Sequence, residues 1–143
     1  MLARREYPRA ELRARLLARG IDAAEVDAAL DELARRGLVS DARYAEAVVS
    51  QKAGRYGRRA IAYALKEKGV DATAASEALG ALDGRDEVDE ALALWRRRFG
   101  TPPADRNDKA RHVRFLLSRG YSMSVALKVL RAAGAATDDD ADS

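Results

Sequence analysis

The chain has 143 residues, enough for one domain or for a short array of small units. It contains no cysteine, which excludes disulfides and thiolate zinc sites and fits a cytoplasmic location. Hydrophobic residues make up 48% of the chain, which argues against wholesale disorder. No apolar run approaches the roughly 20 residues of a membrane span, so we expect no membrane contact.

The charged residues are distributed unevenly around a net charge of +3. Residues 51–69 hold six basic side chains and one acidic one, and residues 95–136 hold ten and two. Residues 70–94 and the tail at 137–143 are acidic instead. The basic blocks fit a polyanionic partner, and they fit an ordinary arginine-rich helical protein equally well.

Apolar residues recur at helical spacing along the whole chain. The sequence predicts helices over residues 8–19, 22–36, 41–54, 58–68, 72–82, 86–99, 107–119 and 122–133, after a short one at 1–6. We expect Gly20 and Gly37 to end the first two long helices, and Asp22 and Ser40 to cap the helices that follow those glycines. The prolines at 102–103 break the helical pattern.

Three segments share one pattern, in which a leucine stands four residues before a glycine and another leucine ten residues after it. The repeated positions are Leu16, Gly20 and Leu30, then Leu65, Gly69 and Leu79, then Leu116, Gly120 and Leu130. The aromatic residues that accompany them, which we also expect to be structural, are Tyr7, Tyr44, Tyr56 and Phe99. Units of this size bury little surface alone, so neighbouring units must stack.

The repeat predicts an all-α protein of tandem three-helix units that form an elongated, curved body. We expect repeat 1 at residues 1–39 with a shortened first helix, repeat 2 at 40–84 and repeat 3 at 85–134. Residues 135–143 are expected to be a disordered acidic tail.

Catalytic chemistry has little support in the sequence. His112 is the single histidine, and we expect it to form a surface pair with Asp108, four residues earlier. No phosphate-binding loop or nucleophile elbow is present, and the acidic cluster at residues 83–90 fits a helix start. We therefore expect no enzyme activity, no metal and no cofactor.

Several stretches resemble the RecX regulatory family. They are GLVSDARYA at residues 37–45, RYGRRAI at 55–61, LKEKGV at 65–70, KARHVRFLLSRGYS at 109–122, and the opening LARREY and ELRARL at 2–7 and 11–16. The resemblance covers residues 1–133, with several motifs in order and at matching spacing. Family members usually carry more residues before the equivalent of residues 2–5, so the first helix here looks shortened.

The resemblance implies an all-α regulator of DNA repair, DNA recombination and the SOS response. We expect the protein to be a monomer. Its partners would be the RecA protein and the RecA–single-stranded DNA filament, whose ATP hydrolysis and strand exchange it would inhibit. From charge and repeat position, our candidates for contacts with RecA or DNA are Arg43, Arg55, Arg58, Arg59, Lys66, Lys68, Arg96, Arg97, Arg98, Arg111, Arg114 and Arg119. Two alternatives stay open: a helical repeat module that binds DNA directly without RecA, and a scaffold for another acidic protein.

Overall fold

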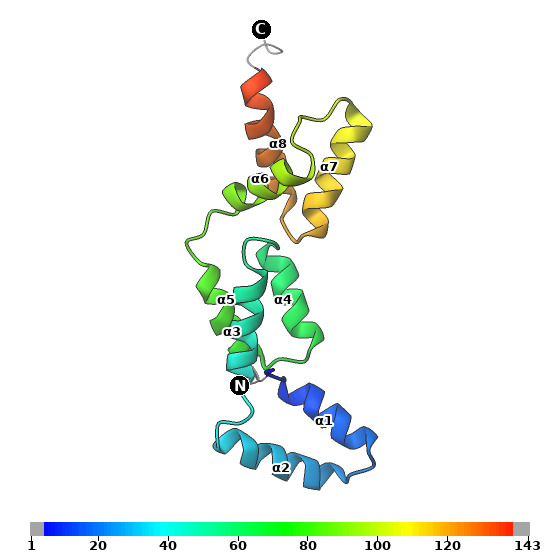
Figure 1. Ribbon diagram of the computed structural model, residues 1–143, viewed down its shortest axis with the longest axis vertical. Coiled ribbons are helices and arrows are strands. Elements are labelled where there is room, and N and C mark those ends of the chain that lie inside the picture. The colour runs from blue at the N-terminus through cyan, green and yellow to red at the C-terminus, as the bar shows by residue number, and fades with distance from the viewer. Residues whose placement is uncertain (1–4, 139–143) are drawn as a thin grey trace. The chain divides into compact units, whose positions relative to one another are not determined.

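The computed structural model describes residues 5–138, and within them the chain forms helices and no strand. The elements are α1 (Arg9–Ala18), α2 (Ala23–Arg35), α3 (Asp41–Lys52), α4 (Arg58–Glu67), α5 (Ala72–Leu79), the 3₁₀ turn η1 (Gly80–Leu82), α6 (Glu87–Arg98), α7 (Arg106–Ser118) and α8 (Met123–Asp138) (Figure 1). The all-α class predicted from the sequence is confirmed.

The helix ends follow the local signals. The Asp22 carboxylate accepts the backbone N–H groups of Ala24 and Glu25 at 3.0 and 3.4 Å, which satisfies two donors at the start of α2. Gly20, which follows α1, has a φ of +86°, a left-handed conformation that glycine adopts without steric cost. The predicted cap and the predicted helix end are both confirmed.

Both ends of the chain differ from the sequence prediction. Helix α8 runs to Asp138, so residues 135–138, predicted to be disordered, are helical. The alanine-rich sequence explains this, because alanine has the strongest intrinsic preference for helix and Gly134 alone does not end one. Residues 5–8 precede α1 without forming a helix, and the remainder of the predicted short helix and acidic tail lies outside the described residues.

The chain divides into two compact units. The N-terminal unit contains residues 1–51 and 62–83, and the C-terminal unit contains residues 52–61 and 84–143. Helix α4 contributes its first residues to the C-terminal unit and the rest to the N-terminal unit. The boundaries of the three repeats stay a prediction.

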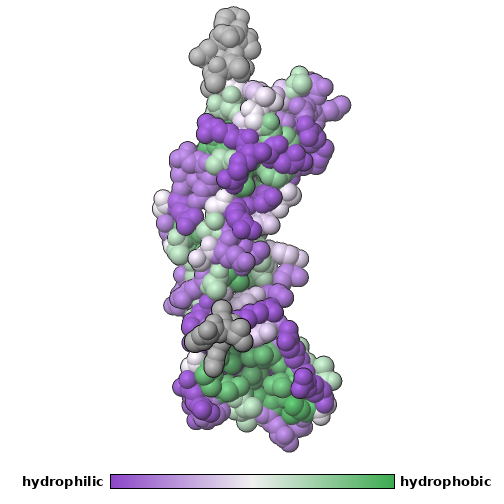
Figure 2. All heavy atoms as spheres, in the orientation of Figure 1, coloured by the Kyte–Doolittle hydropathy of each residue, from purple (hydrophilic) through white to green (hydrophobic). Residues whose placement is uncertain are grey.

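Asp41 joins the starts of three helices in the N-terminal unit. Its two carboxylate oxygens accept the backbone N–H of Arg9, the first residue of α1, and that of Asp71, the N-cap of α5, at 2.9 and 2.8 Å. Asp41 itself opens α3, where its charge is favoured by the helix dipole. Helices α1 and α2 form a hairpin, and Figure 2 shows an apolar area on the visible face of this part of the chain.

The core of the C-terminal unit lies among α6, α7 and α8. Helix α8 packs on α6 and α7, and Trp95, Leu116 and Val129 are buried between them. Tyr121, in the turn between α7 and α8, is 1% exposed. This core fixes the ends of α6 and α7, which carry most of the surface described next.

Candidate binding surface

Cations and aromatic rings alternate along one surface of the C-terminal unit. The side chains, in spatial order, are Lys52, Tyr56, Arg119, Phe115, Arg98, Phe99 and Arg111. We call this set the cation–ring ladder. Every cation in it lies within cation–π range of at least one ring.

Two arginines each lie over two rings and so connect the ladder. The Arg119 guanidinium carbon is 5.0 Å from the centre of the Tyr56 ring and 5.3 Å from that of Phe115. The Arg98 carbon is 5.8 Å from the Phe115 ring and 5.0 Å from the Phe99 ring. The two ends are formed by Lys52 over Tyr56 at 4.8 Å and by Arg111 over Phe99 at 5.0 Å.

Helix periodicity explains why α7 supplies three members. Arg111, Phe115 and Arg119 are spaced four residues apart, so they lie along one face of α7 and its C-cap. Arg98 and Phe99 come from the last residue and the C-cap of α6. The remaining two members come from the end of α3 and the segment that leads into α4.

Backbone contacts hold that segment against the end of α7. The N–H of Gly57 donates to the carbonyl oxygen of Arg119 at 2.6 Å. The Arg119 guanidinium in turn donates to the carbonyl oxygen of Arg55 at 3.2 Å. Arg119 is therefore fixed by two rings and two backbone contacts, and its position depends on the fold as well as on charge.

His112 supports the ladder from inside and is not the surface residue that the sequence suggested. It is 2% exposed, because Trp95 and Phe99 cover it. Its Nδ1 accepts the Trp95 indole N–H at 2.9 Å, and its ring stacks on Phe99 with 3.8 Å between centres. Nδ1 must therefore be unprotonated, and burial lowers the pKa of the imidazole, so His112 is neutral at pH 7.

The predicted partner of His112 has another role. Asp108 Oδ2 lies 3.6 Å from His112 Nε2, while Asp108 Oδ1 accepts two hydrogen bonds from Arg111 at 2.7 and 3.1 Å. The Ala104 backbone N–H and then Arg111 lower the pKa of the Asp108 carboxyl, so it is ionised at pH 7. Asp108 thus offsets the positive charge of Arg111. It does not pair with the other three cations of the ladder.

The ladder arrangement suits anion binding. A guanidinium that stacks on a ring keeps its N–H donors along its edge, where they can form paired hydrogen bonds to phosphate or carboxylate oxygens. Because the rings already restrict the arginine side chains, less conformational entropy is lost when an anion binds.

The predicted contact residues are not all brought together. Arg98, Arg111 and Arg119 are in the ladder, and Arg55 adjoins it through its carbonyl oxygen. Arg59, Arg96, Arg97 and Arg114 are exposed cations of the C-terminal unit, and the backbone N–H of Arg58 donates to Glu87 at 3.0 Å. Lys66 and Lys68 are exposed in the N-terminal unit.

Arg43 lies in the N-terminal unit and has local partners. Its guanidinium donates to the Glu6 carboxylate at 3.0 Å and to the Gly37 carbonyl oxygen at 2.8 Å.

Two residues of the ladder were not predicted as contacts from the sequence. Lys52 belongs to the basic block at residues 51–69 but was given no contact role, and Phe115 was given no role. The four-residue spacing of Phe115 from Arg111 and Arg119 was the signal that identifies it.

Two further features are absent from the part of the chain that the structure describes. Among the side chains that the structure describes, no three from His, Asp or Glu are grouped so that they could hold a metal ion. Within the same part of the chain, no helix combines the length and the apolar character that crossing a bilayer requires. The fold and the ladder together define a helical repeat protein with a surface rich in cations and rings.

Comparison with known proteins identifies the family. Three family models match in order along the chain: the first three-helix domain of RecX at residues 1–33, the second at 40–79 and the third at 85–130. The chain belongs to the RecX family, and the predicted tandem three-helix architecture is confirmed.

Relatives of similar length support this assignment. The chain is 47% identical to the regulatory protein RecX of Leptothrix cholodnii, over 97% of this chain and 88% of the relative. It is 42% identical to the protein of the same name from Chromobacterium violaceum, with the same coverage. The crystal structure of RecX from Lactobacillus salivarius matches 89% of this chain and 85% of that chain with a TM-score of 0.71 and 21% identity, which shows the shared fold.

Proposed function

We propose that this protein regulates homologous recombination and DNA repair by binding the RecA recombinase and the RecA–single-stranded DNA filament. Binding would lower the ATP hydrolysis and strand exchange of RecA. The observation that carries the proposal is the run of three RecX domains in family order along nearly the whole chain. The relatives are named regulatory proteins, which agrees with a non-catalytic role.

The ladder is the surface that we assign to this contact. It presents Arg98 and Arg119 in fixed positions, and a RecA filament offers both acidic protein surface and DNA phosphate. Contacts made by several units of one chain would add through effective concentration, so that weak single contacts give tight binding. We also propose that the protein is a monomer and that it acts in the cytoplasm.

The test is the single-strand-dependent ATP hydrolysis of RecA from the same organism, with this protein titrated in. We expect inhibition well below one protein per RecA, because a protein that bridges or caps filament subunits acts on more than one of them. Unchanged hydrolysis at equimolar protein would contradict the proposal.

A second candidate function is direct DNA binding without RecA, which the ladder also fits. Stacked arginines suit phosphate oxygens, and binding would weaken steeply with salt. The two functions differ in one measurement, because a direct DNA binder retains single-strand affinity in the absence of RecA and leaves RecA hydrolysis unchanged once DNA is in excess.

A further inference from the structure

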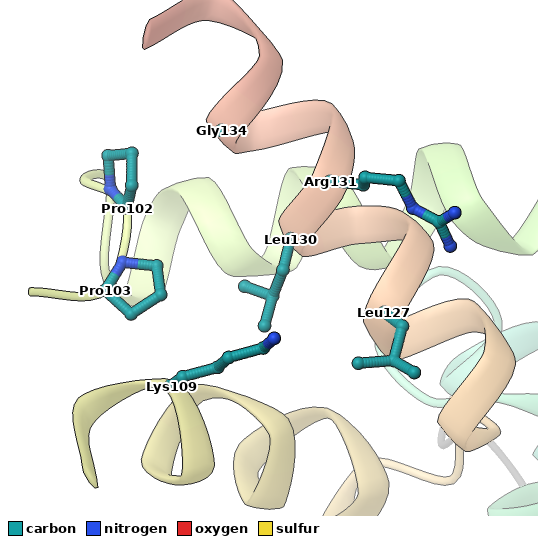
Figure 3. Close-up of a pocket in the computed structure, with 7 residues that line it drawn as sticks. All are labelled: Pro102, Pro103, Lys109, Leu127, Leu130, Arg131 and Gly134. Carbon is teal, nitrogen blue, oxygen red and sulfur yellow. The ribbon is translucent and has the colours of Figure 1, made fainter. Parts of the chain in front are cut away.

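A second basic site lies in the C-terminal unit, and none of the residues that line it belongs to the ladder. It is a hollow of about 440 Å³ lined by Pro102, Pro103, Lys109, Leu127, Leu130, Arg131 and Gly134 (Figure 3). This volume lies within the range of ordinary ligand sites. The hollow is open to solvent and large enough for one or two side chains.

Two leucines and two prolines form the apolar part of its lining, which we call the floor. Leu127 and Leu130 project from α8, with exposures of 38% and 7%, and the two prolines of the loop before α7 stand opposite (Figure 3). The proline rings restrict the backbone φ angles of residues 102 and 103 in that loop. Gly134, one helical turn beyond Leu130, has no side chain to fill the end of the hollow.

Two cations stand at different edges of this floor. Lys109 extends from α7 toward Leu130, and the Arg131 guanidinium lies beyond Leu130 on the side away from the prolines (Figure 3). Within the described residues, neither side chain has an ion pair or a hydrogen bond, whereas Arg111 is paired with Asp108. The hollow therefore offers two uncompensated positive charges separated by apolar surface.

We propose that this hollow binds an acidic protein segment in which one or two large apolar side chains are flanked by carboxylates. The apolar side chains would occupy the floor between the prolines and α8, where burial is favourable. The flanking carboxylates would pair with Lys109 and Arg131. A nucleic-acid backbone fits less well, because its phosphates would leave the leucine and proline floor uncovered.

This inference goes beyond the proposed function and does not depend on RecA as the partner. Its probe is a fluorescein-labelled peptide, DDLFDD, titrated with the full chain and followed by anisotropy. The pocket variant is Lys109→Glu/Arg131→Glu. The matched control is Arg106→Glu/Lys128→Glu, which makes the same charge change on the same two helices at exposed residues that do not line the hollow.

We expect the pocket variant to weaken peptide binding by about tenfold or more, and the control variant by less than about twofold. The reason is that reversing a surface charge affects mainly the peptide carboxylate in direct contact with that side chain. Leu127→Ser, which keeps both charges, should also weaken binding. The peptide DDSSDD should bind more weakly than DDLFDD to the wild-type chain.

Three results would overturn the inference. If both charge variants weakened peptide binding equally, the peptide would be attracted only by the net charge of the protein. Equal affinity for DDSSDD and DDLFDD would show that the apolar floor is not used. The third result would assign the hollow to nucleic acid: the wild-type chain binds a decanucleotide of thymidine but not the peptide, and the pocket variant no longer binds the decanucleotide. The ATP hydrolysis assay for the proposed function is unaffected by any of these outcomes.

Discussion

Gly57 packs against the backbone of Gly120, and neither glycine has room for a side chain. A Cβ atom added to Gly57 would stand 2.5 Å from the carbonyl oxygen of Gly120. One added to Gly120 would stand 2.6 Å from the backbone nitrogen of Ala60, at a φ of +92°. The two glycines allow the segment before α4 to pack on the turn after α7, and this packing places Tyr56 against Arg119.

Gly120→Ala is therefore expected to lower the free energy of unfolding by about 3 kcal/mol or more, since it combines a left-handed backbone with a steric clash. Gly37→Ala is the matched control, because Gly37 has a φ of +73° but nothing within 4 Å of an added Cβ. The control should cost about 1–2 kcal/mol. Urea denaturation followed by circular dichroism measures both, and equal losses would contradict the close packing.

Tyr121→Phe is expected to keep or raise stability. The hydroxyl of Tyr121 is buried without a hydrogen-bond partner among the described residues, and leaving such a group unsatisfied costs about 1–3 kcal/mol. Removing it should change the free energy of unfolding by between zero and about +1 kcal/mol at pH 7. A clear loss of stability would mean that the hydroxyl has a partner, such as a buried water molecule.

The same substitution should change the response to alkaline pH. Burial, followed by the charges of Glu90 and Glu87, raises the pKa of Tyr121 to about 12. Between the ordinary tyrosine pKa of about 10 and this value, the unfolded chain releases a proton that the folded chain retains, so the wild type loses stability as pH rises. Tyr121→Phe should lose less stability from pH 9 to pH 11, and parallel losses would contradict the raised pKa.

His112 should make the protein less stable in mild acid. Burial lowers its pKa in the folded state, so as pH falls below about 6.5 the unfolded chain takes up a proton that the folded chain resists. The free energy of unfolding should fall between pH 7.5 and pH 5.5, by no more than about 1.4 kcal/mol per pH unit.

His112→Gln tests this directly, because His112 is the only histidine in the chain. The variant should have a flatter dependence of unfolding free energy on pH over the same range, whatever its absolute stability. A variant with the slope of the wild type would show that His112 does not titrate differently in the folded and unfolded states.

Phe115→Leu separates ladder geometry from charge. It removes the ring on which both Arg98 and Arg119 lie, while a large apolar side chain and every charge remain. Binding to RecA filaments should weaken by about fivefold, as expected for the loss of two cation–π contacts. The matched control is Tyr63→Leu, which removes a 64% exposed ring outside the ladder, and an equal effect of the two changes would contradict the role of the ring.

Local features of the fold are readable from the sequence, and the ladder is not. The Asp22 cap and the Gly20 helix end depend on neighbours two or three residues away. The residue types at these positions are therefore enough to predict both features. Tyr56 meets Arg119 across 63 positions, through a backbone approach that no periodicity reveals. The prediction that His112 lies on the surface was wrong for a related reason, because its burial depends on Trp95, 17 residues earlier.

We propose that the ladder forms the contact with the RecA filament. The most direct test compares Arg98→Glu/Arg119→Glu with Arg19→Glu/Arg97→Glu in the RecA ATP hydrolysis assay. The control makes the same charge change at exposed arginines, and Arg19 is the C-cap of α1 as Arg119 is of α7. We predict that the ladder variant needs about tenfold or more protein for half-maximal inhibition while the control stays near the wild type. Equal inhibition by the two variants, with both folded, would contradict the claim.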